Sequence, residues 1–97
     1  MGLFNLFRRK KRDDEAERRA LLLRAGRITE GTVAEVGADV EGGEITRILY
    51  SYVVNSVEYQ SWQTLDPEQR QQQANYLPDS RVTIRYDPKH PGNSIVI

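Results

Sequence analysis

The feature that most constrains the fold is an alternating run over residues 44–54. Large apolar side chains fill every second position, at Ile48, Tyr50, Tyr52 and Val54. The intervening positions hold Arg47, Leu49, Ser51 and Val53. Because successive side chains of a strand point to opposite faces, the first set predicts a buried face and the second an outer face. The run therefore predicts a strand in a mainly β protein.

A hairpin is predicted immediately after this run. Asn55 and Ser56 form a two-residue turn candidate, since asparagine tolerates positive φ. Residues 57–64 then return as the partner strand and carry Tyr59 and Trp62. We expect the tyrosines to face the core. If Trp62 lies outside the sheet beside Leu49 or Val53, it marks a protein-contact patch.

Three further strands are predicted. Residues 28–36 read as a strand in which Gly31 marks a bulge or bend, followed by a loop over 37–43. Residues 81–86 alternate cleanly, and a dense turn over 87–93 precedes a short last strand at 94–97. Five short strands favour a small antiparallel meander that curls toward a barrel. A flatter sheet with both helices on one face is the alternative.

An N-terminal helix is predicted over residues 14–25. Asp14 is the expected N-cap, Glu17 completes a capping-box pattern, and Gly26 ends the helix. An apolar stripe is expected to pack on the β domain; it comprises Ala16, Ala20 and Leu23, with Leu21 and Leu22 beside it.

A second helix is predicted between the third and fourth strands. Asp66 fits the N-cap, Pro67 the first helical position and Gln69 the capping-box position. The helix is expected to run to about Tyr76, where Tyr76 and Leu77 hold its end. Its glutamines are expected to be solvated; they are Gln69, Gln71, Gln72 and Gln73.

The charge of the chain is unevenly distributed. Residues 1–27 carry nine basic and four acidic residues, a net of +5, whereas residues 28–97 have a net of −5. We divide the chain into a flexible apolar-basic segment at 1–12, a helix at 13–26 and a β domain at 27–97. The candidate contacts with an anionic membrane surface are Leu3, Phe4, Phe7, Arg8, Arg9, Lys10, Lys11 and Arg12. The alternative for this segment is a frayed terminus.

The sequence offers little for catalysis. It has no cysteine and one histidine, His90, so it predicts neither a thiolate nor a multi-histidine metal site. No pattern indicates a catalytic or cofactor-binding residue, and Glu41 and Glu44 lie in a predicted solvated loop. No apolar run is long enough to span a bilayer, and no signal peptide is recognisable. We expect a cytoplasmic, membrane-peripheral protein that is not an enzyme.

The C-terminal residues resemble a known family. The run Val82-x-Ile84-x-Tyr86-Asp87-Pro88, followed by Pro91 and Ser94, is similar to the ending of the bacterial domain of unknown function 3592 family. Gly31-x-Val33, Tyr50-x-Tyr52-x-Val54 and Tyr59 match upstream pieces, so the resemblance covers about residues 26–97. The family has no established activity, and the resemblance implies no catalytic residues. Its members commonly carry transmembrane helices, from which this short, charged N-terminal helix departs.

Two hypotheses for function follow. The first is a noncatalytic protein-interaction module, with an unidentified protein partner, held near the cytoplasmic membrane face by residues 1–12. The second is a nucleic-acid-associated protein whose basic N-terminal segment contacts phosphates. The net negative charge of residues 28–97 disfavours nucleic-acid binding by the β domain. Free strand edges leave both a monomer and a dimer open.

Overall fold

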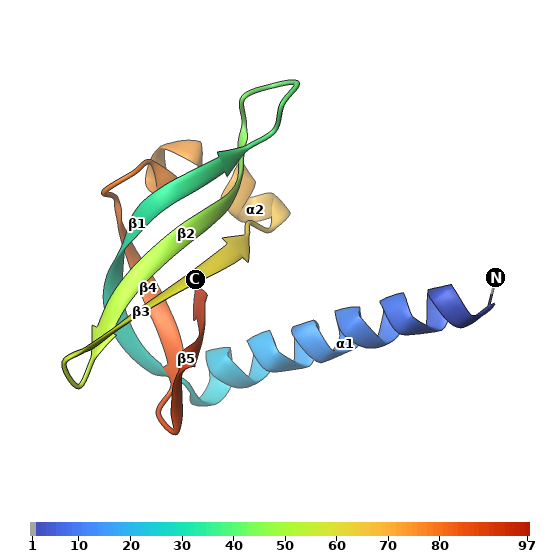
Figure 1. Cartoon of the computed structure of the whole chain (residues 1–97), viewed down its shortest axis with the longest axis horizontal. Coiled ribbons are helices and arrows are strands. Elements are labelled where there is room, and N and C mark those ends of the chain that lie inside the picture. The colour runs from blue at the N-terminus through green and yellow to red at the C-terminus, as the bar shows by residue number, and fades with distance from the viewer. Residues whose placement is uncertain (1) are drawn as a thin grey trace.

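The computed structural model describes the backbone of residues 2–97 and the side chains of residues 14–97. The elements in chain order are α1 (Gly2–Ala25), β1 (Arg27–Ala38), β2 (Ile45–Val54), β3 (Val57–Thr64), α2 (Pro67–Arg70), the 3-10 helix η1 (Gln73–Tyr76), β4 (Arg81–Asp87) and β5 (His90–Val96). Figure 1 shows the strands wrapped around one another, with α1 leading into β1. The prediction of a mainly β domain with an N-terminal helix and a short helix between β3 and β4 is confirmed.

The five strands form one antiparallel sheet in the order β3-β2-β1-β4-β5. Because β3 and β5 lie close together, the sheet curls into a nearly closed barrel instead of the flatter alternative. The order differs from a sequential meander at one point, where the chain passes from β3 through α2 and η1 to the far side of β1. We call the place where β3 and β5 face each other the seam.

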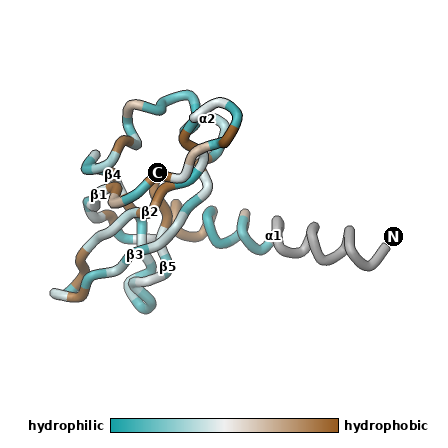
Figure 2. The backbone as a smooth tube through the Cα atoms, turned by 45° about the horizontal axis from the view of Figure 1, so that its top comes forward, coloured by the Kyte–Doolittle hydropathy of each residue, from teal (hydrophilic) through white to brown (hydrophobic). Residues whose placement is uncertain are grey.

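The core of the barrel matches the alternation of the sequence. Figure 2 shows hydrophobic residues in the strands, interspersed with hydrophilic ones. The core residues with less than a tenth of their surface exposed include Val33, Ile48, Tyr50, Tyr52, Val54, Val82, Ile84 and Val96. Tyr52 stacks between Tyr50 and Tyr59, with ring centroids 5.8 and 5.5 Å apart. The tyrosines therefore face inward, as predicted.

The β2–β3 hairpin also forms where the sequence predicts it. Asn55 and Ser56 both have positive φ, at 50° and 67°, which matches the right-handed twist of a two-residue hairpin. Val54 pairs with Val57 across the turn, and the register continues without a shift to the pair Arg47–Thr64. The turn therefore fixes which residues of β3 face the core.

The bulge of β1 is not at Gly31, where the sequence predicted a bulge or bend. The register of β1 with β2 shifts between Val33 and Glu35, while Gly31 pairs regularly with Val82. Gly31 is instead a position where neighbouring groups leave no room for a side chain. A Cβ there would lie 2.3 Å from the Ser51 carbonyl oxygen and 2.4 Å from Ile84 Cδ1. The residue lets the strands of the curled sheet approach each other.

The predictions for α1 need two corrections. The helix already includes residues 2–12, so Asp14 lies inside it and is not the N-cap. Leu22 is the side chain that packs on the domain, at 3% exposure, while Ala16 and Ala20 are exposed and Leu23 is half-exposed. The helix therefore turns a different face to the domain than predicted: Leu22, expected beside the apolar stripe, is the centre of the buried face. Gly26 follows the helix, and its N–H donates to the Leu22 carbonyl at 2.8 Å.

The segment after β3 begins as predicted and then diverges. Asp66 and Gln69 form the reciprocal capping box, with Pro67 at the first turn. The α-helix ends at Arg70, however, and a separate 3-10 turn carries the buried Tyr76. Leu77 is exposed and does not hold the end of the helix.

Two of the four glutamines expected in solvent bond to main-chain groups instead. Gln73 accepts from the N–H of Ile45 at 2.7 Å and donates to its carbonyl at 3.0 Å. Gln69 is buried at 7% exposure and reaches β5. Gln73 holds the chain against Ile45 at the start of β2, which explains why a regular helix does not continue.

The last strand is longer than predicted. β5 begins at His90, so the predicted turn over 87–93 narrows to the four residues from Asp87 to His90. Asp87 Oδ1 accepts the N–H of Lys89 at 2.9 Å, which is the side-chain turn bond expected ahead of a proline-containing bend. The register of β4 with β5 shifts between Tyr86 and Asp87, next to the turn. Pro91 lies beside this irregularity and near the start of an edge strand, where proline is tolerated.

Candidate functional site

Trp62 lies on the outer face of the sheet. It projects from β3 with 48% of its surface exposed, directly opposite Leu49 on β2. The guanidinium carbon of Arg47 sits 5.3 Å from the centre of its ring. Val53, 57% exposed, lies further along β2 on the same face. The sequence analysis took Trp62 as the mark of a contact patch if its ring lies outside the sheet beside Leu49 or Val53. The ring lies outside the barrel beside Leu49, so this condition is met.

The seam is closed by side chains. Gln63 holds Val96 through two hydrogen bonds, accepting from its N–H at 2.8 Å and donating to its carbonyl at 3.0 Å. Gln69 Nε2 donates to the same carbonyl at 3.0 Å. The side-chain amide of Gln63 thus takes the place of a neighbouring strand for Val96.

Two tyrosines of the core complete this closure. The hydroxyl groups of Tyr50 and Ser94 lie 2.7 Å apart, and the Tyr52 hydroxyl donates to the Pro91 carbonyl at 2.5 Å. Burial raises the pKa of the Tyr52 hydroxyl, which keeps it protonated as a donor at neutral pH. The interior of the barrel is therefore tied to β5 by hydroxyl groups as well as by amides.

A groove of about 610 Å³ runs over the seam. We call it the seam groove; its lining residues include Arg18 and Arg19 of α1, Ser61, Trp62 and Thr64 of β3, and Asn93 of β5. Arg18 fixes α1 across the groove, because its Nη1 donates to Asn93 Oδ1 at 2.8 Å and to the Ser94 carbonyl at 3.0 Å.

Charges in the groove are paired with one another. Glu15 receives two hydrogen bonds from Arg18, at 2.8 and 3.0 Å. The hydrogen bond from this guanidinium lowers the pKa of the Glu15 carboxyl. Arg19 pairs with Asp66 at 3.6 Å. The walls of the groove therefore present two cations and two carboxylates that neutralise each other.

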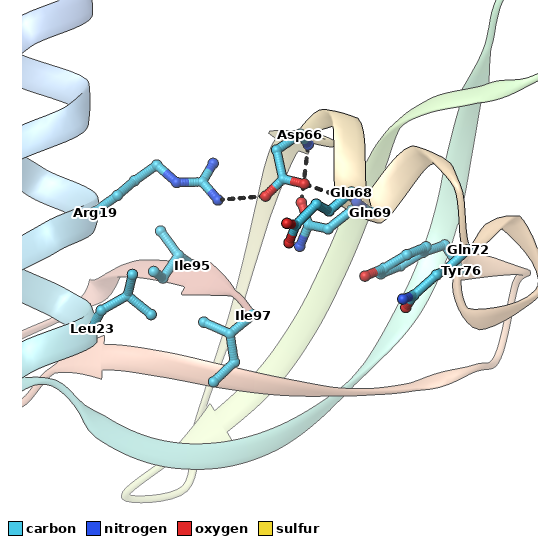
Figure 3. A pocket seen from close by; sticks show the side chains of 9 residues that line it. All are labelled: Arg19, Leu23, Asp66, Glu68, Gln69, Gln72, Tyr76, Ile95 and Ile97. Carbon is cyan, nitrogen blue, oxygen red and sulfur yellow. Dashed lines mark hydrogen bonds and ion pairs between the residues drawn. The ribbon is translucent and has the colours of Figure 1, made fainter.

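A smaller pocket of about 310 Å³ lies between α1 and α2 (Figure 3). Leu23, Ile95 and Ile97 gather on one side of it, and the Arg19–Asp66 ion pair spans the other. Leu23 and Ile97 are each about half exposed. The pocket joins apolar side chains to a polar rim and can accept a small apolar side chain.

The residues considered for chemistry are not brought together. His90 is exposed at the start of β5, and Glu44 pairs with Arg70 at 3.3 Å. Within the described part of the chain, no three histidine, cysteine, aspartate or glutamate side chains group as metal ligands. One buried side-chain atom there lacks a hydrogen bond, Arg85 Nε, although the Nη1 of the same guanidinium donates to Gly26 O at 3.0 Å.

The proposed membrane contacts from Leu3 to Arg12 lie outside the residues whose side chains are described. Their backbone belongs to α1. Among the described residues, no helix combines the length and the apolar character needed to cross a bilayer.

Sequence reasoning missed the closure of the seam. Gln63 occupies an inward position of an alternating strand, because its neighbours Trp62 and Thr64 point outward. A polar amide at a predicted core position was the available signal, since a buried amide requires partners. The same pattern did not identify the partner, which lies 33 residues further along the chain.

The comparisons with known proteins identify a family. A family model described as Domain of unknown function (DUF3592) matches residues 24–97. No curated protein matches the chain, and no solved structure does. The matched range covers all five strands and the closing Tyr86-Asp87-Pro88 motif, and the chain therefore belongs to the DUF3592 family.

Proposed function

We propose that this chain is a noncatalytic protein-interaction module at the cytoplasmic face of a membrane. The observation that carries the interaction half is the exposed Trp62 beside Leu49 and under Arg47. Tryptophan and arginine are enriched among residues that dominate binding energy at protein interfaces. The outer face of β2 and β3 therefore supplies an anchor of the kind that such interfaces use.

The membrane half rests on the sequence of residues 1–12. Leu3, Phe4 and Phe7 provide apolar area, and five consecutive cations follow at residues 8–12. Each cation near an anionic surface contributes about 1 kcal/mol, and apolar side chains add to this by insertion. The combination supports reversible attachment through an interfacial helix. The absence of cysteine fits a reducing cytoplasm.

Vesicle co-sedimentation tests the membrane half. The full chain is expected to bind vesicles that contain anionic phosphatidylglycerol and to bind neutral phosphatidylcholine vesicles weakly. A variant with Leu3, Phe4 and Phe7 changed to serine is expected to lose binding, whereas a Lys89→Gln control on the β4–β5 turn keeps it. Negligible binding of the full chain to anionic vesicles ends this half of the proposal.

The alternative function uses the same N-terminal charge for nucleic acid. The net +5 of residues 1–27 supports it. It requires an affinity for a labelled DNA or RNA oligonucleotide that falls steeply with salt and disappears when Arg8–Arg12 are neutralised. Steep salt dependence together with no vesicle binding would favour this alternative over membrane attachment.

A further inference from the structure

Most arginines with described side chains have a polar partner within the chain. Four of them pair with a carboxylate: Arg18, Arg19, Arg70 and Arg81. Arg85 donates to the Gly26 carbonyl. Within residues 14–97, the Arg47 guanidinium has neither a carboxylate partner nor a hydrogen bond, and it lies against the ring of Trp62. Its N–H donors are therefore open to a group from another molecule.

Two neighbouring strands nevertheless hold this guanidinium in place. Gly37 on β1 is the register partner of Arg47. A Cβ on Gly37 would lie 2.6 Å from Arg47 Cγ and Nε and 2.7 Å from Cζ, so Arg47 fills the space where a side chain of residue 37 would stand. From β3, the centre of the Trp62 ring lies 5.3 Å from the same Cζ. A side chain held in this way loses less conformational entropy on binding than a mobile one.

Apolar side chains lie next to the held guanidinium on the outer face of the sheet. Leu49 is the register partner of Trp62, and Val53 follows further along β2. Trp62 and Val53 are each about half exposed. A fixed arginine beside an exposed tryptophan is the combination that dominates binding energy at many protein interfaces. The patch therefore offers one cation and an apolar surface to the same ligand.

We propose that Arg47 and Trp62 bind a partner protein through one carboxylate, from an aspartate or glutamate that stands next to a large apolar side chain. The carboxylate accepts hydrogen bonds from the planar guanidinium, which matches two carboxylate oxygens with two parallel N–H groups. The neighbouring apolar side chain packs on Trp62 and Leu49. The proposal deepens the interaction function proposed above and rests on it, because it names the chemistry of the partner.

The charges around the patch limit the ligand to a single carboxylate. Residues 28–97 carry a net charge of −5, which repels a nucleic acid with its many phosphates. On the outer face, Glu35 is the register partner of Leu49, and Glu58 is that of Val53. These two acidic residues disfavour a strongly acidic segment. The occupant is therefore a mainly apolar segment whose one acidic residue lies at the Arg47 end of the patch, away from Glu58.

Peptide titration of the full chain tests the proposal. Trp62 is the only tryptophan of the chain, so its indole N–H gives an unambiguous NMR signal. The probe is the blocked peptide SLELS, and the control is SLQLS, which lacks the carboxylate. Both peptides are expected to shift the Trp62 signal, and SLELS is expected to bind about fivefold more tightly, as for a well-placed exposed ion pair. No shift with either peptide up to tens of millimolar would overturn the proposal.

A matched pair of charge variants identifies the guanidinium that binds. Arg47→Gln is expected to bind the two peptides equally. Arg81→Gln removes the same charge from the outer face of β4 and is expected to keep the fivefold preference. A fivefold preference that survives in Arg47→Gln would overturn the proposal. Equal losses in the two variants would also overturn it, because the preference would then reflect net charge alone.

Gly37→Ala tests whether the held position of Arg47 matters. The new Cβ meets only the flexible Arg47 side chain, which can move away without disturbing the strands. The variant is expected to shift the Trp62 signal without peptide and to lower the preference for SLELS below about twofold. Gly42→Ala, whose new Cβ meets nothing within 4 Å, is expected to change neither. A fivefold preference in folded Gly37→Ala would overturn the pre-oriented guanidinium as the binding group.

Two outcomes separate this proposal from the interaction function on which it rests. Equal binding of both peptides that is lost in Trp62→Ala would overturn the carboxylate and leave Trp62 as an apolar contact. A Trp62 signal that shifts with protein concentration in the absence of peptide would overturn the proposal in favour of a second copy of the chain. Vesicle binding of Arg47→Gln is expected to equal that of the unchanged chain, so membrane attachment is assessed independently.

Discussion

The barrel is held together differently on its two sides. Four of its strand contacts are backbone ladders, from β3 through β2 and β1 to β4 and β5. The fifth, at the seam, consists of bonds from the side chains of Gln63, Gln69, Tyr50 and Tyr52. A ladder depends on the path of the main chain and tolerates many side chains, whereas the seam depends on particular residues. The two sides should therefore respond differently to substitution.

The largest expected effect disturbs the ladder side. Gly31→Ala places a Cβ within 2.4 Å of the Ser51 carbonyl oxygen and Ile84 Cδ1, where backbone and core must move. Overpacking of this kind costs typically 1–3 kcal/mol, and we expect about 3 kcal/mol because the contacted oxygen belongs to the main chain. Urea unfolding measures the change. Gly42→Ala is the control, since its new Cβ meets nothing within 4 Å, and an equal loss in both variants would contradict the close approach.

Opening the seam is expected to cost less. Gln63→Leu keeps apolar bulk but leaves the Val96 N–H without its acceptor, for which we expect a loss of about 2 kcal/mol. Amide exchange should accelerate at Val96 while Tyr59 and Ser61 remain protected by β2. Gln60→Leu, at an exposed position of the same strand, is the control. Loss of protection throughout β2 and β3 would show that the seam and the ladders are one cooperative unit.

Removing one hydroxyl group from the seam is expected to cost less stability than replacing Gln63. Tyr52→Phe deletes the donor to Pro91, with an expected loss of about 1 kcal/mol at neutral pH. Tyr59→Phe is the control, because Tyr59 makes no hydroxyl bond within the described part of the chain. Thermal unfolding of the two variants should separate them, and indistinguishable midpoints would argue against a role for the Tyr52 hydroxyl.

The same tyrosine gives the barrel a dependence on alkaline pH. Burial raises the pKa of Tyr52, and also that of Tyr76, so the folded protein holds these protons more tightly than the unfolded chain does. The stabilising contribution of these two tyrosines is therefore fully present below pH ~10, the ordinary pKa of tyrosine, and falls as the pH rises above it. Tyr52→Phe should make this fall shallower without abolishing it, because Tyr76 remains. Urea unfolding from about pH 9 to about pH 11 measures this fall in stability. The same fall in Tyr52→Phe and in the unchanged chain would contradict the role given to Tyr52.

The smallest expected effect is at the outer face. Trp62→Ala removes a half-exposed ring that holds neither a ladder nor the seam, and its contact with Arg47 contributes about 0.5 kcal/mol. Urea unfolding should detect no more than about this loss. A change of several kcal/mol would mean that Trp62 supports the fold and would weaken its assignment to partner binding.

The sequence predicted the parts of the fold that local rules determine. Alternation placed Tyr50 and Tyr52 in the core, and positive φ at Asn55 and Ser56 set the hairpin. The capping box at Asp66 also formed as expected. Each of these features depends on residues within a few positions of one another.

The missed features depend on distant partners. Gln73 leaves the predicted helix to bond Ile45, 28 residues away, and Gln63 reaches Val96 across the seam. The side of α1 that packs, at Leu22, is set by where β4 and β5 lie. For the site, Trp62 could be identified from the sequence, but the groove beside it could not, because α1, β3 and β5 form it jointly.

The junction between α1 and β1 has a mechanical consequence. One residue, Gly26, separates them. Its N–H donates to the Leu22 carbonyl and its carbonyl accepts from the Arg85 guanidinium, so both of its backbone groups are held. A one-residue connection leaves α1 and β1 little freedom to move relative to each other. The direction of the α1 axis therefore determines the direction of β1, the central strand. Any surface that captures α1 would hence set which way the barrel faces, and with it the direction from which a second molecule can approach.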